Sequence, residues 1–275
     1  MRAKARAFVI SVRPRVLGAL LRRDFLIARS YKATFTLDVF FGVMNLVIFY
    51  FISKTVSLRA GTLDGAPTYF AFASAGIVLT VVMQSATTGL ARRVREEQLT
   101  GTLEILATQP VSSVEMAAGL TGFPSAFGVV RAAFYLLAAG ALLNLDMSRT
   151  SFVGLGLILI ATGVTLSAIG VFLGALVLVL KQGETLAGLV TFGFGLLSGA
   201  LFPRELLPGW LEALGDVLPT RFALDGMRRA LFEGAGWQGD FLALLVTAVI
   251  LLPVSIACFS YALRVVKRSG SLSQY

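Results

Sequence analysis

Long apolar stretches alternate with short polar segments along the whole chain. About 20 consecutive apolar residues are enough for a helix to cross the hydrocarbon core of a bilayer. Six stretches approach or exceed that length: 33–52, 69–90, 114–145, 152–180, 185–202 and 241–263. The pattern predicts an all-α polytopic membrane protein with six transmembrane helices. We expect them to form one transmembrane domain that covers residues 1–275.

The third stretch carries signals for both its beginning and its course. Ser112 and Glu115 have the spacing of a capping box, which predicts that a helix begins there. Pro124 lacks a backbone N–H donor, so we expect it to kink this helix. The third and fourth stretches are each near 30 residues long, or about 45 Å of helix, so they should tilt or extend beyond the bilayer.

The basic residues lie unevenly between the segments that flank these stretches. Most of the 24 Lys and Arg residues fall in the N-terminal segment, in the segment after the second stretch or near the C-terminus. Basic residues accumulate on the cytoplasmic side of membrane proteins. The distribution therefore predicts that both termini are cytoplasmic. The formal net charge of +9 is then mainly a signal of topology and requires no nucleic-acid partner.

Residues 14–31 differ from the six stretches because they are amphipathic. On a helical wheel the apolar residues share one arc, and arginines that include Arg22 and Arg23 lie opposite. This pattern predicts a helix on the inner leaflet with its basic side near anionic lipid. The helix is either a simple interfacial anchor or also a contact for a cytoplasmic partner. Asp24 falls inside the apolar arc, so it should pair with a nearby arginine or be protonated.

The longest polar segment on the predicted inner side covers residues 91–113. It begins with three arginines and continues with three glutamates. Gly101 favours a break between two short helical pieces, and Pro110 ends the second piece. A charged two-piece helix at the membrane surface suits docking to a soluble partner. An ordinary solvated loop is the alternative interpretation of the same residues.

The segment 203–239, on the predicted outer side, is too long and too apolar for a plain loop. Its apolar residues recur at mixed helical spacing, and three prolines interrupt them. We predict two short helices that form a re-entrant segment seated in the outer interface. Non-helical backbone at membrane depth must pack against protein or line water. Trp210 and Trp237 are either interfacial anchors or, with this segment, part of a gate at the outer end of a path.

Charged and small residues inside the stretches suggest two further features. Arg131 and Asp38 are the charged residues placed within spans, where an unpaired charge is costly. They could pair if they lie at similar depth, and Arg131 either lines a substrate path or inter-helix network or only snorkels. Gly195 and Gly199 form a G-x-x-x-G pattern, which allows close helix packing within one subunit or at a dimer interface.

Composition narrows the chemistry that the chain can perform. Hydrophobic residues make up 56% of the 275 residues and charged residues 14%, an excess that one water-soluble core cannot absorb. There is no histidine and one cysteine, which excludes histidine-based triads and metal sites and also intrachain disulfides. We therefore expect no catalytic residue and no metal site. The sequence has no G-x-x-x-x-G-K-[S/T] phosphate loop, so ATP-driven transport would need an ATPase on a separate polypeptide.

Two motifs resemble one known family. Residues 97–112, E-Q-L-T-G-T-L-E-I-L-A-T-Q-P-V-S, resemble the E-x-x-x-G-T-L-E-x-L-x-x-x-P-V-S loop of type-2 ABC exporter permeases. Residues 207–228 are similar to the region between spans five and six in that family. The likeness covers nearly the whole chain and is greatest for the daunorubicin-resistance and lipo-oligosaccharide exporter group. Gln109 departs from the pattern, because many members have threonine directly before the proline.

The resemblance implies a permease subunit in the inner membrane of a bacterium. It would form a homodimer, or a heterodimer with a related permease, and pair with two ATPase subunits that bind ATP and Mg; this chain itself would hold no cofactor. The amphipathic helix and the loop after span two would contact those ATPases. The coupling residues would be Glu96, Glu97, Gly101, Thr102, Leu103, Glu104, Pro110, Arg22 and Arg23. The outer re-entrant gate would include Pro208, Trp210, Pro219 and Asp225.

We expect an exporter permease that moves a hydrophobic drug-like or lipid-linked substrate outward. A polysaccharide or glycolipid exporter permease of the same family is one alternative. An ion-coupled secondary transporter is another, but that class usually needs intramembrane carboxylates, and the spans hold almost none beyond Asp38. A membrane-embedded enzyme would need a catalytic constellation, which the sequence lacks.

Overall fold

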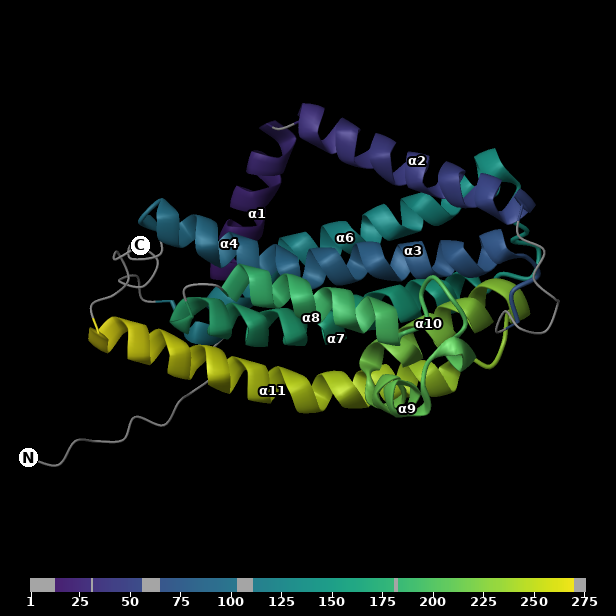
Figure 1. Ribbon diagram of the computed structural model, residues 1–275. Helices are drawn as coiled ribbons and strands as arrows, with labels where there is room; N and C mark the ends of the chain where they lie inside the picture. Colours follow the sequence, from purple (N-terminus) through teal and green to yellow (C-terminus); the bar gives the residue numbers. More distant parts are fainter. Residues whose placement is uncertain (1–12, 31, 56–64, 103–110, 181–182, 270–275) are drawn as a thin grey trace, which may run out of the picture.

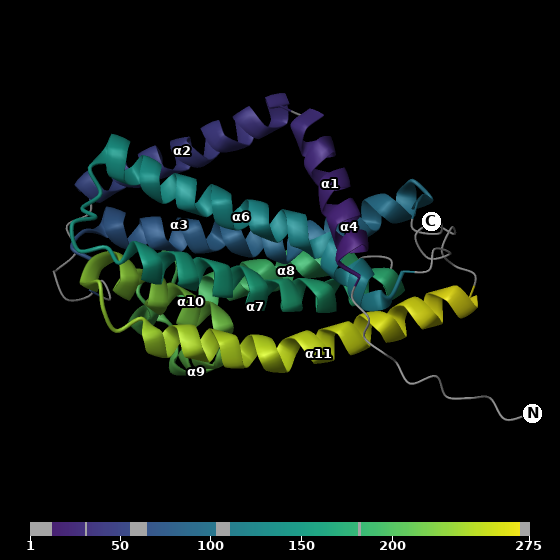
Figure 2. The same cartoon turned by 180° about the vertical axis from the view of Figure 1, so that it is seen from behind.

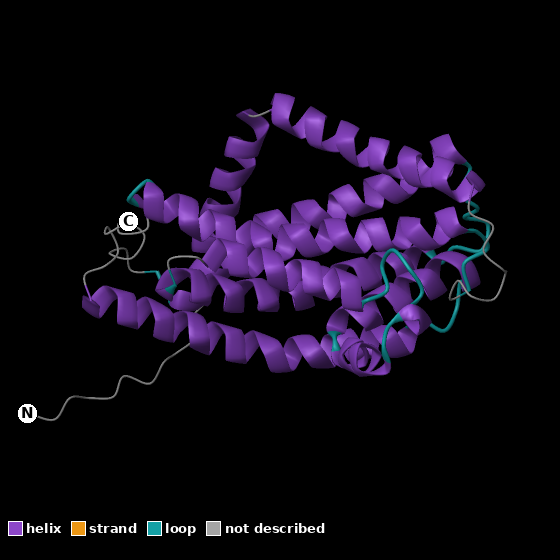
Figure 3. Cartoon of the chain, in the orientation of Figure 1, coloured by secondary structure: helices purple, strands orange, loops and turns teal. Residues whose placement is uncertain are grey.

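The computed structural model describes residues 13–30, 32–55, 65–102, 111–180 and 183–269, and within these ranges the chain is helical and contains no strand (Figure 3). Among the described residues, five helices are long and apolar enough to cross a membrane: Thr36–Thr55, Tyr69–Glu97, Ser113–Leu143, Phe152–Val179 and Gln238–Arg268. These findings confirm an all-helical chain with several candidate spans. The fifth expected span is the shorter helix Gly183–Leu197, whose 15 residues reach about 22 Å, less than the roughly 30 Å hydrocarbon core.

The helices follow the order of the predicted stretches, with short elements between them. The principal helices are α1 (Pro14–Ser30), α2 (Lys32–Thr55), α3 (Tyr69–Ala86), α4 (Thr88–Leu99), α6 (Ser113–Leu143), α7 (Phe152–Val179), α8 (Gly183–Leu197) and α11 (Gln238–Ser269). Between α8 and α11 lie the 3-10 helix η1 (Arg204–Leu206), α9 (Gly209–Val217), α10 (Pro219–Arg228) and the π-helix η2 (Arg229–Glu233).

The long helices form one elongated bundle (Figures 1 and 2). Helix α3 lies inside it and is mostly buried, whereas α2 lies on the outside and buries little. Helices α1 and α4 gather at one end of the bundle and α9 and α10 at the other, near the loops 65–68 and 144–151 (Figure 1). Polar groups collect at both ends, so each end is a candidate for function.

Helices α3 and α4 are nearly continuous, which moves the start of the polar loop. The sequence predicts that the span ends at 90, but the helical backbone continues through α4 to Leu99. Thr87 marks the junction: its Oγ1 donates to the carbonyl of Met83 at 2.7 Å and lies 2.8 Å from the Oγ1 of Thr191 in α8. This buried pair links α8 to the junction. The charged residues from Arg92 to Glu97 therefore lie on a helix that ends just before Gly101, in agreement with the first of the two predicted helical pieces.

The start of α6 agrees with its capping signal. The Ser112 hydroxyl accepts a hydrogen bond from the Glu115 N–H at 3.2 Å, and the Glu115 carboxylate accepts one from the Ser112 N–H at 2.8 Å. The helix continues past Pro124 and ends at Leu143, where the capping residue Asn144 adopts a left-handed conformation with φ 53°.

The small residues of α7 pack against other helices of the same chain. A Cβ on Gly170 would lie 2.0 Å from the carbonyl oxygen of Ala86, so only glycine allows α7 to approach α3 this closely. The Ser167 hydroxyl lies 2.6 Å from that of Ser125 in α6. These contacts are packing within one subunit.

Candidate functional site

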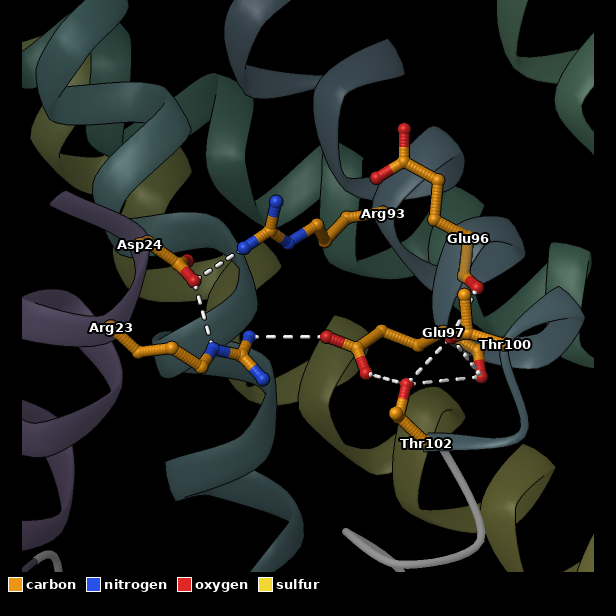
Figure 4. A network of polar contacts seen from close by, with 7 residues as sticks. All are labelled: Arg23, Asp24, Arg93, Glu96, Glu97, Thr100 and Thr102. Atoms are coloured by element: carbon orange, nitrogen blue, oxygen red, sulfur yellow. Dashed lines mark hydrogen bonds and ion pairs between the residues drawn. The ribbon is translucent and has the colours of Figure 1, made fainter. Parts of the chain in front are cut away.

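A network of charged side chains joins α1 to α4 at one end of the bundle (Figure 4). Asp24 is only 3% exposed, although α1 lies at the surface. Its Oδ1 accepts from the Nε of Arg23 at 3.0 Å and forms an ion pair with Arg93 of α4. Asp24 therefore pairs with arginine, which is one of the two outcomes expected from its place in the apolar arc. A buried carboxylate needs such partners because desolvation penalises an isolated charge.

The network continues from Arg23 into the segment that resembles the family loop. The Nη2 of Arg23 lies 3.1 Å from the Oε1 of Glu97, which is buried. The hydroxyl of Thr102 donates to the other carboxylate oxygen of Glu97 (Figure 4). Between them Gly101 has φ +71°, a left-handed conformation that glycine adopts easily and that lets the chain turn after α4. Three of the expected coupling residues, Arg23, Glu97 and Thr102, thus share one network.

Among the remaining expected coupling residues, those that the structure describes contribute no side chain to this network. Arg22 is exposed, and Glu96 contributes only its backbone carbonyl, which accepts from the Thr100 hydroxyl at 2.8 Å. Leu103, Glu104 and Pro110 lie outside the described residues. The role of all these residues in coupling stays a prediction.

A second anchor holds α1 against the start of α6. The Nε and backbone N–H of Arg13 both donate to Oε1 of Glu115, at 3.0 and 2.8 Å, and its Nη2 donates to the other oxygen at 3.0 Å. The hydrogen bond to Glu115 raises the pKa of the Arg13 guanidinium. Further along, Leu20 packs so closely on Gly119 of α6 that a Cβ there would lie 2.3 Å from its Cδ1. Helix α1 is therefore fixed to the bundle at both α4 and α6.

Three adjoining cavities lie along the polar side of α3, among α2, α6 and α8. Their volumes are about 510, 350 and 330 Å³, and all three are lined by Gln84. We call them together the α3 groove. Its polar lining includes Thr80, Thr88, Arg92, Asp38 and Arg131, and its apolar lining includes Phe192, Leu196, Phe202 and Phe49.

Arg131 and Asp38 meet in this groove. The Nη1 of Arg131 lies 3.4 Å from the Oδ2 of Asp38, and its Nη2 donates to the Ser85 hydroxyl at 3.3 Å. The Asp38 side chain is 56% exposed, whereas that of Arg131 is 16% exposed. The hydroxyl of Tyr135 donates to the Asp38 backbone carbonyl at 2.9 Å, which ties α2 to α6. The two charges that the sequence placed within spans therefore lie at the same level and contact each other.

Gly195 and Gly199 do not form one helical face. Helix α8 ends at Leu197, and Gly199 has φ +75° and is buried inside the subunit. A Cβ on Gly199 would lie 2.5 Å from the Cγ of Arg204, so its small size serves contacts within the chain. Gly195 lines the α3 groove beside Met83, whose methyl group would lie 3.2 Å from an added Cβ. The G-x-x-x-G spacing in the sequence is therefore not a continuous packing surface.

A second cluster of charges holds the two short helices at the opposite end. Arg204 lies 3.8 Å from Asp216 of α9 and 3.3 Å from Asp225 of α10. Arg221 lies 2.6 Å from Asp216 and 3.5 Å from Asp225. The cluster joins the segment after α8 to both short helices. Asp225, named as a gate residue from the sequence, is thus part of the link that positions α9 and α10.

The other expected gate residues have different surroundings. Pro219 is buried at the first turn of α10, a position that suits proline because the N–H there needs no helical partner. Pro208 is exposed just before α9, and Trp210 is 68% exposed. The two short helices are present as expected, while their depth in a membrane and their role as a gate stay predictions.

Arg228 is a buried basic residue that the sequence analysis does not single out. It is 2% exposed, its Nη2 donates to the Gly199 carbonyl at 3.0 Å, and its guanidinium carbon lies 3.8 Å from the ring centroid of Phe72. The signal in the sequence was its position four residues after Leu224, on the apolar face of α10. Arg228 joins α10 to α3 and to the segment after α8.

The chain matches one known protein family. The family model described as ABC-2 type transporter matches residues 15–232, from α1 to η2. Comparison with curated proteins gave no significant match. The matched range includes both charged clusters and the whole lining of the α3 groove. Because this match covers most of the chain, the resemblance is confirmed, and the chain belongs to the ABC-2 type transporter family as a multi-pass permease-type subunit.

Proposed function

We propose that this chain is the permease subunit of an ATP-driven exporter and that a separate ATPase subunit docks at the α1–α4 end. The observation that carries the proposal is the network Arg93–Asp24–Arg23–Glu97–Thr102. It fastens an amphipathic surface helix to the charged segment after the second span. A displacement of α1 would therefore move α4, and a displacement of α4 would move both α1 and α3.

The α3 groove is the proposed substrate path. Its polar lining runs beside α3, and α3 and α4 form a nearly continuous rod from the docking end to the opposite end. Arg131 and Asp38 would hold the groove in one conformation through an ion pair that a moving substrate or helix can break. Phe192, Leu196 and Phe202 supply an apolar wall. This combination supports a hydrophobic drug-like or lipid-linked substrate, moved outward, and a glycolipid is the alternative within the family.

We further propose that two permeases and two ATPases assemble, with α2 and α8 facing the second permease. Helix α2 buries little within its own subunit, and Phe40, Phe41 and Phe51 are more than half exposed. In α8, Leu189 and Phe192 are 64% and 71% exposed beside the open side of the α3 groove. A second copy would cover these faces and close the groove. The short helices α9 and α10 would then lie in the outer interface and gate its exit.

The test is the coupling between ATP hydrolysis and substrate. The permease is purified together with a candidate ATPase subunit, and ATPase activity is measured with and without substrate in proteoliposomes. Glu97→Gln removes the charge that pairs with Arg23 and should reduce substrate stimulation about fivefold, because such a pair contributes on the order of 1 kcal/mol. Glu205→Gln, at an exposed site in η1, is the matched control and should retain stimulation.

The outcomes distinguish the proposed ATP-driven permease from the alternative functions. Full stimulation in Glu97→Gln would show that the network is not the coupling element. Transport that needs an ion gradient and proceeds without ATP would instead support a secondary transporter. Membership of the ABC-2 family already favours an ABC-type permease over that alternative.

A further inference from the structure

A separate groove lies on the outside of the bundle, between the beginning of α6 and the second half of α11. Its volume is about 660 Å³, within the range of roughly 300–1,000 Å³ that is usual for small-ligand sites. None of its lining residues lines the α3 groove. The lining residues are Ser113, Val114, Leu252, Pro253, Ile256, Ala257, Ser260 and Arg264.

The length of this groove matches one leaflet of a bilayer. Twelve residues separate Leu252 from Arg264 along α11, which corresponds to about 18 Å of helix. The hydrocarbon core is about 30 Å thick, so one leaflet contributes about 15 Å. The part of the lining from Leu252 to Ala257 is apolar. The polar residues Ser113 of α6 and Arg264 of α11 lie together at one end of the groove. An acyl chain fits such a groove better than a compact polar molecule.

The polar end of the groove carries positive charge. The Nε of Arg264 donates to the Ser260 carbonyl at 3.3 Å, which turns the guanidinium back along α11 toward the groove. The Ser260 hydroxyl is buried and has no hydrogen-bond partner among the described residues. Ser113 and Val114 form the first turn of α6, where the helix dipole favours an anion. Glu115 in the same turn is fully buried, and Arg13 neutralises its charge.

We propose that this groove binds an anionic phospholipid. One acyl chain lies against Val114, Ile256 and Leu252, and the phosphate lies between Arg264 and the first turn of α6. Charge complementarity selects the anionic headgroup, and the one-leaflet length selects a lipid over a peptide. The lipid would bridge α6 and α11 at the end where Glu115 anchors α1. This proposal requires only that the chain spans a membrane, so it stands apart from the proposed coupling and substrate.

The test is lipid binding to the full-length chain, purified in detergent and stripped of lipid, then titrated with phosphatidylglycerol and followed by native mass spectrometry. Phosphatidylcholine is the zwitterionic comparison. Arg264→Gln should weaken phosphatidylglycerol binding about fivefold, the effect expected for one basic residue at an anionic headgroup. Arg268→Gln, which removes an equal charge one turn further along α11, should leave binding unchanged.

A second pair of variants tests the apolar part without changing charge. Ala257→Trp fills the groove and should remove the bound lipid, whereas Val254→Trp, at a 52% exposed site outside the lining, should retain it. Monodispersity on size exclusion identifies any variant that fails to fold. Equal binding of the two phospholipids, equal losses in Arg264→Gln and Arg268→Gln, or full binding by Ala257→Trp would each overturn the proposal.

Discussion

Substitution Asp24→Asn should loosen α1 from the bundle without altering its shape. The variant leaves Arg23 and Arg93 facing a neutral amide in place of a carboxylate. Removing one partner of a buried ion pair costs about 3–5 kcal/mol. The side chains of Arg23 and Arg93 are 33% and 21% exposed, so hydration of their charges offsets part of that free-energy loss. We therefore expect a local cost of about 2 kcal/mol, which corresponds to a roughly thirtyfold larger opening constant for α1.

Hydrogen exchange of the α1 amides measures this opening directly. Amides in the second half of α1 should exchange about thirtyfold faster in Asp24→Asn, while amides in α7 keep their rates. Asp216→Asn removes a 45% exposed carboxylate at the opposite end and serves as the control. A double variant with Arg93→Gln should show less loss than the sum of the two single variants, because both remove the same contact. Unchanged α1 exchange in Asp24→Asn would refute the claim that this network holds α1 in place.

Three further predictions concern packing, capping and the groove. Gly170→Ala should lower the melting temperature in detergent, because the new Cβ would lie 2.0 Å from the Ala86 carbonyl oxygen and reduce the free energy of unfolding by about 1–3 kcal/mol. The control Gly156→Ala, on the same helix, meets open space and should leave the melting temperature unchanged. Ser112→Ala should destabilise the start of α6 by about 1 kcal/mol through loss of the capping box, seen as faster exchange in its first turn; an unchanged rate would contradict this. Arg131→Gln should reduce transport per folded protein more than it reduces assembly, and equal transport would reject a role in the path.

The sequence predicted the features that depend on local pattern. Long apolar runs predicted the main helices, and the Ser112–Glu115 spacing predicted the cap of α6. The conflict of Asp24 with its apolar neighbours predicted a charged partner. These succeed because helical periodicity and capping involve residues close together in the chain.

Features that depend on residues far apart could not be predicted in the same way. Nothing in the sequence identifies Arg93 as the partner of Asp24, because they are brought together only when α1 packs beside α4. The G-x-x-x-G spacing also does not show that α8 ends between Gly195 and Gly199. Arg228 was missed because a buried arginine needs the Phe72 ring and the Gly199 carbonyl, which come from distant segments.

The central claim is that this chain carries substrate only when a separate ATPase drives it from the α1–α4 end. The most direct measurement is transport into proteoliposomes that contain the permease with or without its ATPase, each with and without ATP. We predict transport only when permease, ATPase and ATP are all present, and its loss in Glu97→Gln. Transport by the permease alone, or undiminished ATP-driven transport in that variant, would contradict the account.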